Sequence, residues 1–199
     1  MSAAEVVIAR TGVANIASVV AAFERLGAAV RLVDTPEAIK DAEFVVFPGV
    51  GSFGAGMHNL RESGLADALF TRIHEERATL AICLGQQLLF EESDESPGIR
   101  GLGLLPGRVT RFPNAVRVPQ FGWNAVEPGE GCRFLEPGYA YFANSYRVTQ
   151  LVHGWSGAFS DHGGPFVAAM ERGPVLTCQF HPELSGAWGH RLLERWLKG

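Results

Sequence analysis

The chain has 199 residues, of which 47% are hydrophobic and 19% charged, as expected for one globular domain with a sizeable core rather than a disordered protein. The formal net charge of −4 argues against nucleic acid or an anionic membrane as the main partner. No apolar run approaches the roughly 18 residues of a transmembrane helix, and the N-terminus lacks a basic-then-apolar leader, so we expect a cytoplasmic protein. The three cysteines form no disulfide framework, which fits a reducing compartment.

Strands and helices alternate in the first half. Short apolar runs predict strands over 5–9, 29–33, 44–47 and 79–82. Helices are predicted over 16–26 with Asn15 as cap, from Pro36 with Thr35 as cap, over 65–76 and over 86–92. This alternation is typical of βαβ units and a parallel sheet, in which functional groups collect at the carboxyl ends of the strands.

The second half has a different pattern. Between about residues 101 and 173, glycine and proline are frequent and apolar runs are short, which predicts largely antiparallel strands, including 107–112, 139–148 and 166–171. A buried strand over 175–180 and a helix over 187–197 follow. No linker or repeat divides the chain, so residues 1–199 are expected to form a single domain of the α/β class.

Cys83 directly follows the predicted strand 79–82, and a helix is predicted after it. The neighbouring Ala81 and Gly85 are small, as a tight strand-turn-helix elbow requires. A cysteine at a helix start also meets N–H groups and a dipole that favour a thiolate. A buried structural cysteine is the common alternative, but this context favours a nucleophile.

His181 and Glu183 could complete a catalytic triad. His181 ends an apolar strand, and Glu183 follows two residues later, after Pro182. A histidine can act as the base for a thiol, and a carboxylate can hold its tautomer and stabilise the imidazolium. Alone, His181 would more often be a core or surface histidine, so this interpretation depends on Cys83.

The loop 48–51 reads Pro-Gly-Val-Gly and follows another predicted strand. A phosphate-binding loop or a plain turn is possible, but no Gly-Lys-Ser/Thr follows. Beside a cysteine nucleophile, an oxyanion hole is the simpler interpretation, with the N–H groups of Val50 and Leu84 as donors.

The remaining histidines lack metal-ligand spacing, so no metal is expected. Trp123, next to Gly122, suits either a binding surface or ordinary packing.

Together, these motifs resemble the class I, triad-type glutamine amidotransferases over nearly the whole chain. Within that class, the chain is similar to the family of glutaminase subunits of imidazole glycerol phosphate synthase, in histidine biosynthesis. The segments that carry the resemblance are 48–54, 83–101, 122–124, 141–146 and 181–183. The resemblance implies a three-layer α/β/α, flavodoxin-like fold with a mainly parallel central sheet and antiparallel additions in the second half.

The resemblance also implies a two-step reaction without a cofactor. Cys83 would attack the side-chain amide of glutamine, His181 would protonate the departing ammonia, and water would hydrolyse the γ-glutamyl thioester. A carboxylate such as Glu95 suits the α-ammonium of glutamine. The positions that correspond to glutamine-binding residues are Gly49, Gly51, Gln87, Glu95, Ser145 and Tyr146.

The family further implies a heterodimer with a (β/α)₈ cyclase subunit. The cyclase receives ammonia through its barrel and makes imidazole glycerol phosphate and an aminoimidazole carboxamide ribotide. In the family, glutamine hydrolysis is weak until the cyclase binds its ligand, and the Gly49–Val50 peptide is thought to turn its N–H inward. Asn15, Trp123 and Leu184 are expected at the partner interface.

Some positions depart from the family pattern, and some alternatives stay open. Leu184 stands where a lysine usually contacts the cyclase, which puts that contact in doubt. The other departures are Arg10-Thr11, Ala14, Ala81, Gln120-Phe121 and Asn144. The alternatives are a glutaminase subunit of another synthase (anthranilate type), a free-standing cysteine hydrolase, and a degenerate partner protein that keeps only the fold.

Overall fold

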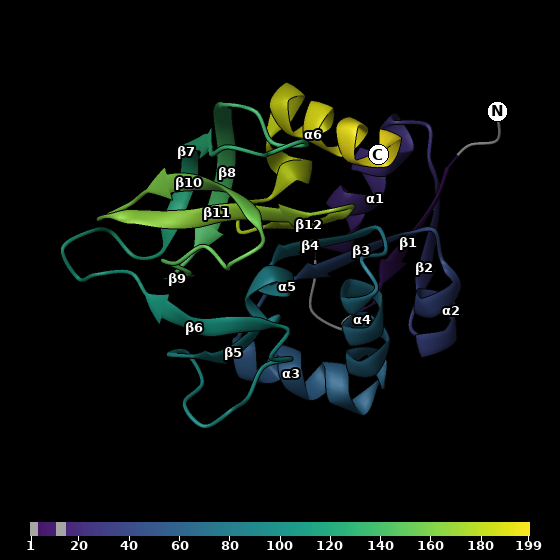
Figure 1. Ribbon diagram of the computed structural model, residues 1–199, viewed down its shortest axis with the longest axis horizontal. Helices are drawn as coiled ribbons and strands as arrows, with labels where there is room; N and C mark the ends of the chain where they lie inside the picture. Colours follow the sequence, from purple (N-terminus) through teal and green to yellow (C-terminus); the bar gives the residue numbers. More distant parts are fainter. Residues whose placement is uncertain (1–3, 11–14) are drawn as a thin grey trace.

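The computed structural model describes residues 4–10 and 15–199, so the departures at Thr11 and Ala14 lie outside the described residues. The first half of the chain forms most of the parallel part of a nine-stranded sheet (Figure 1). Its strands are β1 (Glu5–Ala9), β2 (Ala29–Val33), β3 (Phe44–Gly49) and β4 (Thr79–Cys83), joined by β12 (Val175–Cys178). They lie in the order β2-β1-β3-β4-β12, and all neighbours are parallel. This is the flavodoxin-like order, and it confirms the predicted mainly parallel α/β fold.

Antiparallel strands extend the sheet beyond β12. They are β11 (Pro165–Arg172), β10 (Ser156–Asp161), β7 (Gln120–Pro128) and β8 (Gly138–Asn144). A second, smaller sheet contains β5 (Phe90–Ser93), β6 (Leu105–Arg111) and β9 (Tyr146–Arg147). The antiparallel additions are as predicted, although the sequence prediction omits β5, β7 and β10. The predicted strand 139–148 is divided into β8 and β9.

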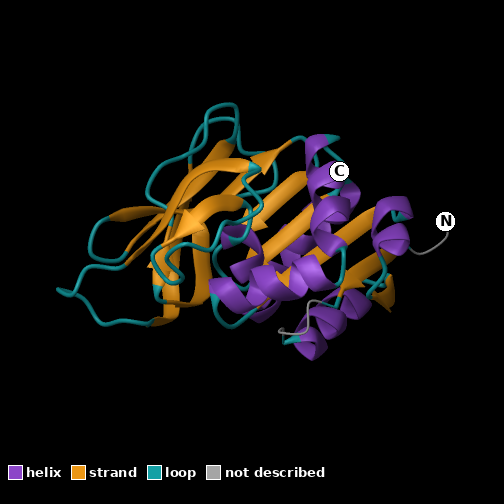
Figure 2. Ribbon diagram, turned by 90° about the horizontal axis from the view of Figure 1, so that it is seen from below, coloured by secondary structure: helices purple, strands orange, loops and turns teal. Residues whose placement is uncertain are grey.

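Helices cover both faces of the sheet, which gives the expected three layers (Figures 1 and 2). On one face, α1 (Ile16–Arg25) and α6 (Gly186–Lys198) bury Phe23 and Trp196. The opposite face is covered by α2 (Pro36–Asp41), α3 (Phe53–Glu62) and α4 (Leu65–His74), which bury side chains such as Met57 and Leu69. Each helix turns its apolar side toward the sheet, as amphipathic helices do.

The predicted helix over 86–92 is wrong. Here α5 (Leu84–Gln87) ends after one turn, and β5 begins at Phe90. Phe90 pairs with Leu105 of β6, so pairing with a distant strand overrides the local helical propensity. The prediction also omits α3. Glycines weaken its helical signal, but Gly56 has a packing reason, because a Cβ there would lie 2.9 Å from Leu88 Cδ1.

Asn15 and Thr35 occupy the N-cap positions of α1 and α2, as predicted. Neither side chain accepts a hydrogen bond from its helix. Asn15 instead donates to Ser18 Oγ over 3.1 Å. The side chain of Ser52 does cap a helix, accepting from Ala55 N at the start of α3.

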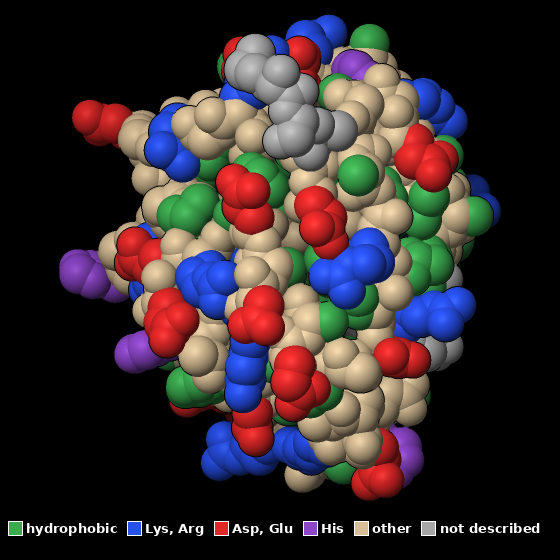
Figure 3. Space-filling model, turned by 90° about the vertical axis from the view of Figure 1, so that its right-hand side faces the viewer, with side chains coloured by type: hydrophobic (Ala, Val, Ile, Leu, Met, Phe, Trp, Pro, Cys, Tyr) green, Lys and Arg blue, Asp and Glu red, His purple; other side chains and the backbone are tan. Residues whose placement is uncertain are grey.

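The edge strand β2 carries one charged side chain, Arg31, whose Nε lies 2.8 Å from Oε1 of Glu5 on the neighbouring strand β1. A charge on an edge strand opposes pairing with another chain. Figure 3 shows this side of the molecule, where acidic and basic side chains are interspersed rather than gathered in a patch of one sign. Within the described residues, none of the helices is both long and apolar enough to cross a membrane.

Candidate active site

Cys83 lies at a sharp turn at the carboxyl end of β4. Its backbone has φ 55° and ψ −110°, an uncommon conformation for a residue with a side chain. The first residues after it pass close to β3, where a Cβ on Gly85 would lie 2.3 Å from the carbonyl oxygen of Phe47. Only glycine fits this position, and the result is the predicted elbow geometry.

The short α5 changes the electrostatic expectation for the elbow. Stabilisation of a thiolate by a helix dipole was expected from a helix over 86–92, but α5 contains only four residues. The dipole of a single turn is small compared with that of a full helix. The helix dipole therefore contributes little at this elbow.

His181 and Glu183 are brought together at the end of β12. Nδ1 of His181 lies 2.8 Å from Oε1 of Glu183, and both side chains are buried. His181 N donates to Tyr141 O over 2.9 Å, which ties the segment to β8. Glu183 lies in the short 3₁₀ helix η1 (Pro182–Leu184), whose Pro182 restricts the turn between the two side chains.

The imidazole of His181 is linked to both other members of the predicted triad. Burial alone would lower the pKa of His181, but hydrogen bonds and charge interactions with Cys83 and Glu183 outweigh burial and raise the pKa to about 10. Because Nδ1 faces Glu183, Nε2 is the nitrogen available to Cys83. The arrangement favours an imidazolium beside the sulfur.

A cavity of about 270 Å³ opens at Cys83. Its size suits a single amino acid more than a drug-sized ligand. The structure gathers most of the predicted oxyanion-hole and glutamine-binding residues in its wall. The lining residues are Val50, Gly51, Cys83, Leu84, Gln87, Glu95, Ala143, Asn144, Ser145, Tyr146 and His181.

Gly49 is the predicted binding residue that does not line this cavity. It lies behind the wall, paired with Cys83 across β3 and β4. A Cβ on Gly49 would lie 2.9 Å from Gly85 N, so the two loops pack backbone to backbone. Gly51, which lines the cavity, has φ 99°, a value that favours glycine.

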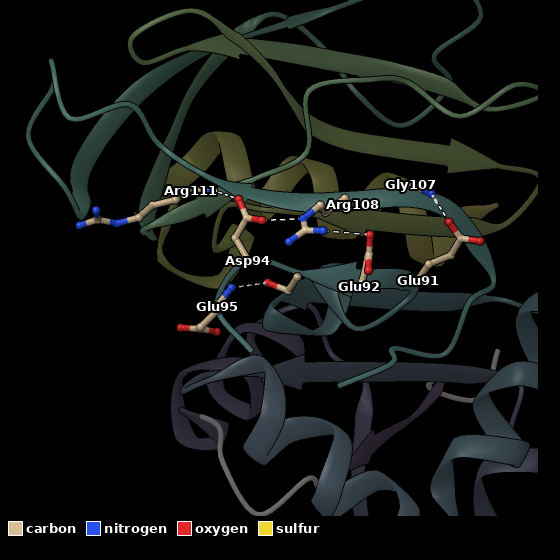
Figure 4. A network of polar contacts seen from close by, with 8 residues as sticks. Glu91, Glu92, Asp94, Glu95, Gly107, Arg108 and Arg111 are labelled. Atoms are coloured by element: carbon tan, nitrogen blue, oxygen red, sulfur yellow. Dashed lines mark hydrogen bonds and ion pairs between the residues drawn. The ribbon is translucent and has the colours of Figure 1, made fainter. Parts of the chain in front are cut away.

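Glu95 connects the cavity to the start of α3. Its Oε2 accepts a hydrogen bond from Phe53 N over 2.6 Å, and its own N–H donates to Ser93 Oγ over 3.2 Å. The preceding residue, Asp94, accepts from Arg108 Nε over 2.5 Å. Figure 4 shows this polar network along β5 and β6. The small sheet thus holds one carboxylate at the cavity wall.

Gln179 and Ser185 also hold the site, although the sequence motifs do not point to them. Gln179 Nε2 lies 3.7 Å from Cys83 Sγ. Ser185 Oγ donates to His181 O over 2.6 Å and accepts from Tyr141 N over 3.0 Å. A signal for Gln179 does exist in the sequence: it precedes His181 by two residues, the spacing that places side chains on one side of a strand.

The three predicted interface residues lie around η1. Leu184 belongs to η1, and the Trp123 ring comes close to Gly186, where a Cβ would lie 3.6 Å from it. Trp123 and Leu184 are 58% and 37% exposed, so both are open to a partner. Asn15 lines a small cavity together with Glu183.

The other cysteines and candidate metal ligands lie apart from this chemistry. Cys178 is buried, and Cys132 is half-buried and donates to Gly157 O. In the described ranges, 4–10 and 15–199, no group of three or more His, Cys, Asp or Glu side chains could hold a metal ion.

Comparison with known proteins gives consistent matches. Residues 11–198 match the family described as glutamine amidotransferase class-I. The imidazole glycerol phosphate synthase subunit HisH of Symbiobacterium thermophilum is 41% identical over 197 residues, covering 97% of this chain and 93% of that protein. The chloroplastic imidazole glycerol phosphate synthase hisHF of Arabidopsis thaliana is 39% identical over 193 residues, covering 94% of this chain but only 33% of that longer protein. A crystal structure of a glutamine amidotransferase aligns with a TM-score of 0.77 at 24% identity, covering 96% of this chain and 97% of that one, which supports the fold.

Proposed function

The chain belongs to the class I glutamine amidotransferase family, and we propose that it is the glutaminase subunit of an imidazole glycerol phosphate synthase. It hydrolyses glutamine to glutamate and ammonia and supplies the ammonia to a (β/α)₈ cyclase subunit in histidine biosynthesis. The observation that carries the proposal is the meeting of Cys83 and His181 at one cavity whose wall also contains Gln87 and Glu95.

The first half-reaction follows from the triad geometry. The Cys83 thiolate attacks the side-chain carbonyl carbon of glutamine, and a C–S bond forms. The N–H groups of Val50 and Leu84 stabilise the oxyanion, and one such donor typically lowers the barrier by roughly 2.7–4 kcal/mol. The imidazolium of His181 gives its proton to the departing nitrogen as the C–N bond breaks, which leaves a γ-glutamyl thioester.

The second half-reaction reverses these proton movements. His181, now neutral, takes a proton from a water molecule that attacks the thioester carbonyl. The C–S bond then breaks, glutamate leaves and the thiolate–imidazolium pair is restored. Glu183 stabilises the imidazolium and fixes its tautomer through the 2.8 Å contact at Nδ1.

Substrate recognition is assigned to the cavity wall. The Glu95 carboxylate binds the α-ammonium of glutamine, because an ionised acceptor makes strong, short hydrogen bonds with a cation. Gln87 contributes a further polar contact, and backbone groups at Ser145 and Tyr146 contact the rest of the amino acid. Gly49 and Gly51 allow the backbone of Val50, the residue between them, to approach the substrate closely.

The cyclase subunit is placed on the side of the molecule around η1 and β7–β8. Trp123 and Tyr141 lie on paired strands and share one face, with their rings 6.2 Å apart. Ala143, on the same face, lines the Cys83 cavity, so a partner bound here is near the source of ammonia. Leu184 belongs to η1, which contacts β8, and Asn15 lines a small cavity with Glu183 of η1. Leu184 makes an apolar contact where relatives with lysine would make a charged one.

The subunit acts as one glutamine amidotransferase domain over residues 1–199, because both hydrophobic clusters pack against the same large sheet. Its three free thiols suit a reducing compartment, and we assign it to the cytoplasm. Glutamine hydrolysis needs no cofactor in this mechanism.

Three measurements test the proposal. The glutamine analogue diazo-oxonorleucine should label Cys83 stoichiometrically and should leave Cys83→Ser unlabelled, with Cys132→Ser as the control that still reacts. Glutaminase turnover should rise when a cyclase subunit carrying its ligand is added. Wild-type turnover in a folded Cys83→Ala variant would refute the nucleophile, and equal rates with and without the cyclase would refute the synthase assignment.

A further inference from the structure

Gln179 is a buried polar residue whose amide is engaged at both ends. It is 1% exposed. Its Nε2 donates to Cys83 Sγ over 3.7 Å, and its Oε1 accepts from Gln87 Nε2 over 2.8 Å. One side chain therefore bridges the proposed nucleophile and a proposed substrate-binding residue.

The backbone holds this bridge in place. Gln179 N donates to Ala168 O over 2.8 Å, which extends the pairing of β11 with β12 by one residue. His181 follows two residues later, in the segment that leads from the end of β12 at Cys178 into η1. The sulfur thus meets an imidazole and an amide from one short segment, which is hydrogen-bonded to β11 at Gln179 and to β8 at His181.

The hydrogen bonds also fix the orientation of the Gln87 amide. Gln87 Nε2 donates to Gln179 Oε1 and to Tyr146 O, the latter over 3.3 Å. A primary amide has only two N–H donors, so both are used. A flipped Gln87 would place its oxygen against Gln179 Oε1, and two acceptors repel. Gln87 is therefore left with its oxygen for the cavity that it lines.

From this geometry we infer that Gln179 is a second hydrogen-bond donor to the reacting sulfur and a positioning residue that makes Gln87 present an acceptor to the substrate. The Gln87 oxygen is a hydrogen-bond acceptor, so it suits a substrate group that offers N–H donors, such as an amide or an ammonium. It disfavours a carboxylate in the same position. This inference rests on the proposed glutaminase function and adds a residue to it.

A donor to sulfur has a measurable consequence. Hydrogen bonds to a charged form stabilise it, so loss of the Gln179 donor disfavours the thiolate. The pH dependence of Cys83 alkylation reports this directly and needs no glutamine. The other thiols interfere little near neutral pH, because burial raises the pKa of Cys132 to about 11 and that of Cys178 well above its ordinary value.

The first experiment measures, by peptide mapping, how iodoacetamide alkylation of Cys83 in the full chain depends on pH. The second measures KM for glutamine in the complex with the cyclase subunit. Gln179→Met keeps the volume but removes both hydrogen bonds. Its alkylation midpoint should rise by about one pH unit, as expected for one hydrogen bond to a charged group, and its KM should rise by roughly tenfold. Gln179→Glu keeps the acceptor for Gln87 and loses the donor to sulfur, so its midpoint should also rise while its KM changes less.

Thr177→Val is the matched control, since Thr177 is buried two residues earlier, on β12. It should leave the midpoint and KM at wild-type values. A wild-type midpoint in either folded Gln179 variant overturns the inference. Lack of glutamine hydrolysis by the wild-type complex would instead overturn the proposed function, while the alkylation comparison would still test the hydrogen bond.

Discussion

Gly85 packs directly on Phe47: a methyl group at Gly85 would lie 2.3 Å from the Phe47 carbonyl oxygen. Gly85→Ala must push α5 away from β3, and this movement would change the elbow that holds Cys83. We expect a loss of about 1–3 kcal/mol in the free energy of unfolding, as for other overpacked sites. Labelling of Cys83 by diazo-oxonorleucine should slow strongly in the same variant. Urea unfolding and the labelling rate check the two effects.

Gly98→Ala is the control for Gly85→Ala. Gly98 has φ 84°, and a Cβ there meets nothing within 4 Å. Its substitution should lower the free energy of unfolding only by the strain of a left-handed backbone, about 1–2 kcal/mol. It should leave the labelling rate of Cys83 unchanged. Equal labelling of Gly85→Ala and wild type would contradict the proposed role of the elbow.

Glu183→Gln should destabilise the protein in a pH-dependent way. The pKa of His181 is raised from 6.5 to about 10, with Glu183 among the causes. A raised histidine pKa stabilises the fold fully below pH 6.5, and that stabilisation is lost as the pH rises through about 10. The free energy of unfolding of the variant should therefore fall most near pH 6, by roughly 3 kcal/mol as for a broken buried pair. The decrease should become smaller toward pH 10.

Free energies of unfolding at several pH values between 6 and 10 would measure this trend. Glu194→Gln is a suitable control, because it removes an exposed carboxylate paired with Lys198. Such surface pairs contribute about 0–1 kcal/mol. A penalty for Glu183→Gln that does not change with pH would mean that the carboxylate has little influence on His181.

The parallel sheet, the turn at Cys83 and the contact between His181 and Glu183 could be predicted because their signals are local. Strands of apolar residues, the elbow around Cys83 and the His181–Glu183 spacing are each visible within a few residues. Features that depend on distant partners were not visible. The guanidinium of Arg72, for example, is buried on a predicted helix only because carbonyl groups such as those of Ile39 and Ala78 accept its hydrogen bonds.

The same reasoning explains the error at α5 and the omission of Gln179. The segment after Gln87 has helical propensity, but its pairing with β6 decides its structure. Gln179 has no motif of its own, and its role depends on contacts with Cys83 and Gln87, 96 and 92 residues away. Sequence patterns identify which residues are reactive more easily than which residues support them.

Glu95→Gln separates the charge of this side chain from its structural contact. An amide oxygen can still accept from Phe53 N, so the start of α3 should keep its position. The loss of the negative charge should raise KM for glutamine by roughly ten- to a hundredfold, the range for a lost charge-assisted hydrogen bond. Steady-state kinetics in the complex would measure it. Glu92→Gln breaks an exposed pair with Arg108 on the same small sheet and should leave KM unchanged.

Trp123→Ala tests the proposed partner face. Trp123 is 58% exposed and meets Tyr141 in a T-shaped ring contact, so its removal should change the free energy of unfolding little. Exposed tryptophans are frequent hot spots at interfaces, and truncation of one typically costs 2 kcal/mol or more, so we expect binding to the cyclase subunit to weaken by at least about thirtyfold. Calorimetric titration of the two subunits would measure the Kd.

Phe70→Ala is the matched control for Trp123→Ala, because Phe70 is also a large exposed aromatic residue, 44% exposed, but lies on α4 across the sheet from α1 and α6. Binding should be unchanged in this variant if the cyclase docks around η1. Equal Kd values for Trp123→Ala and wild type would move the interface elsewhere. Weaker binding without any loss of basal glutamine hydrolysis would show that Trp123 acts through the partner and not through the cavity at Cys83.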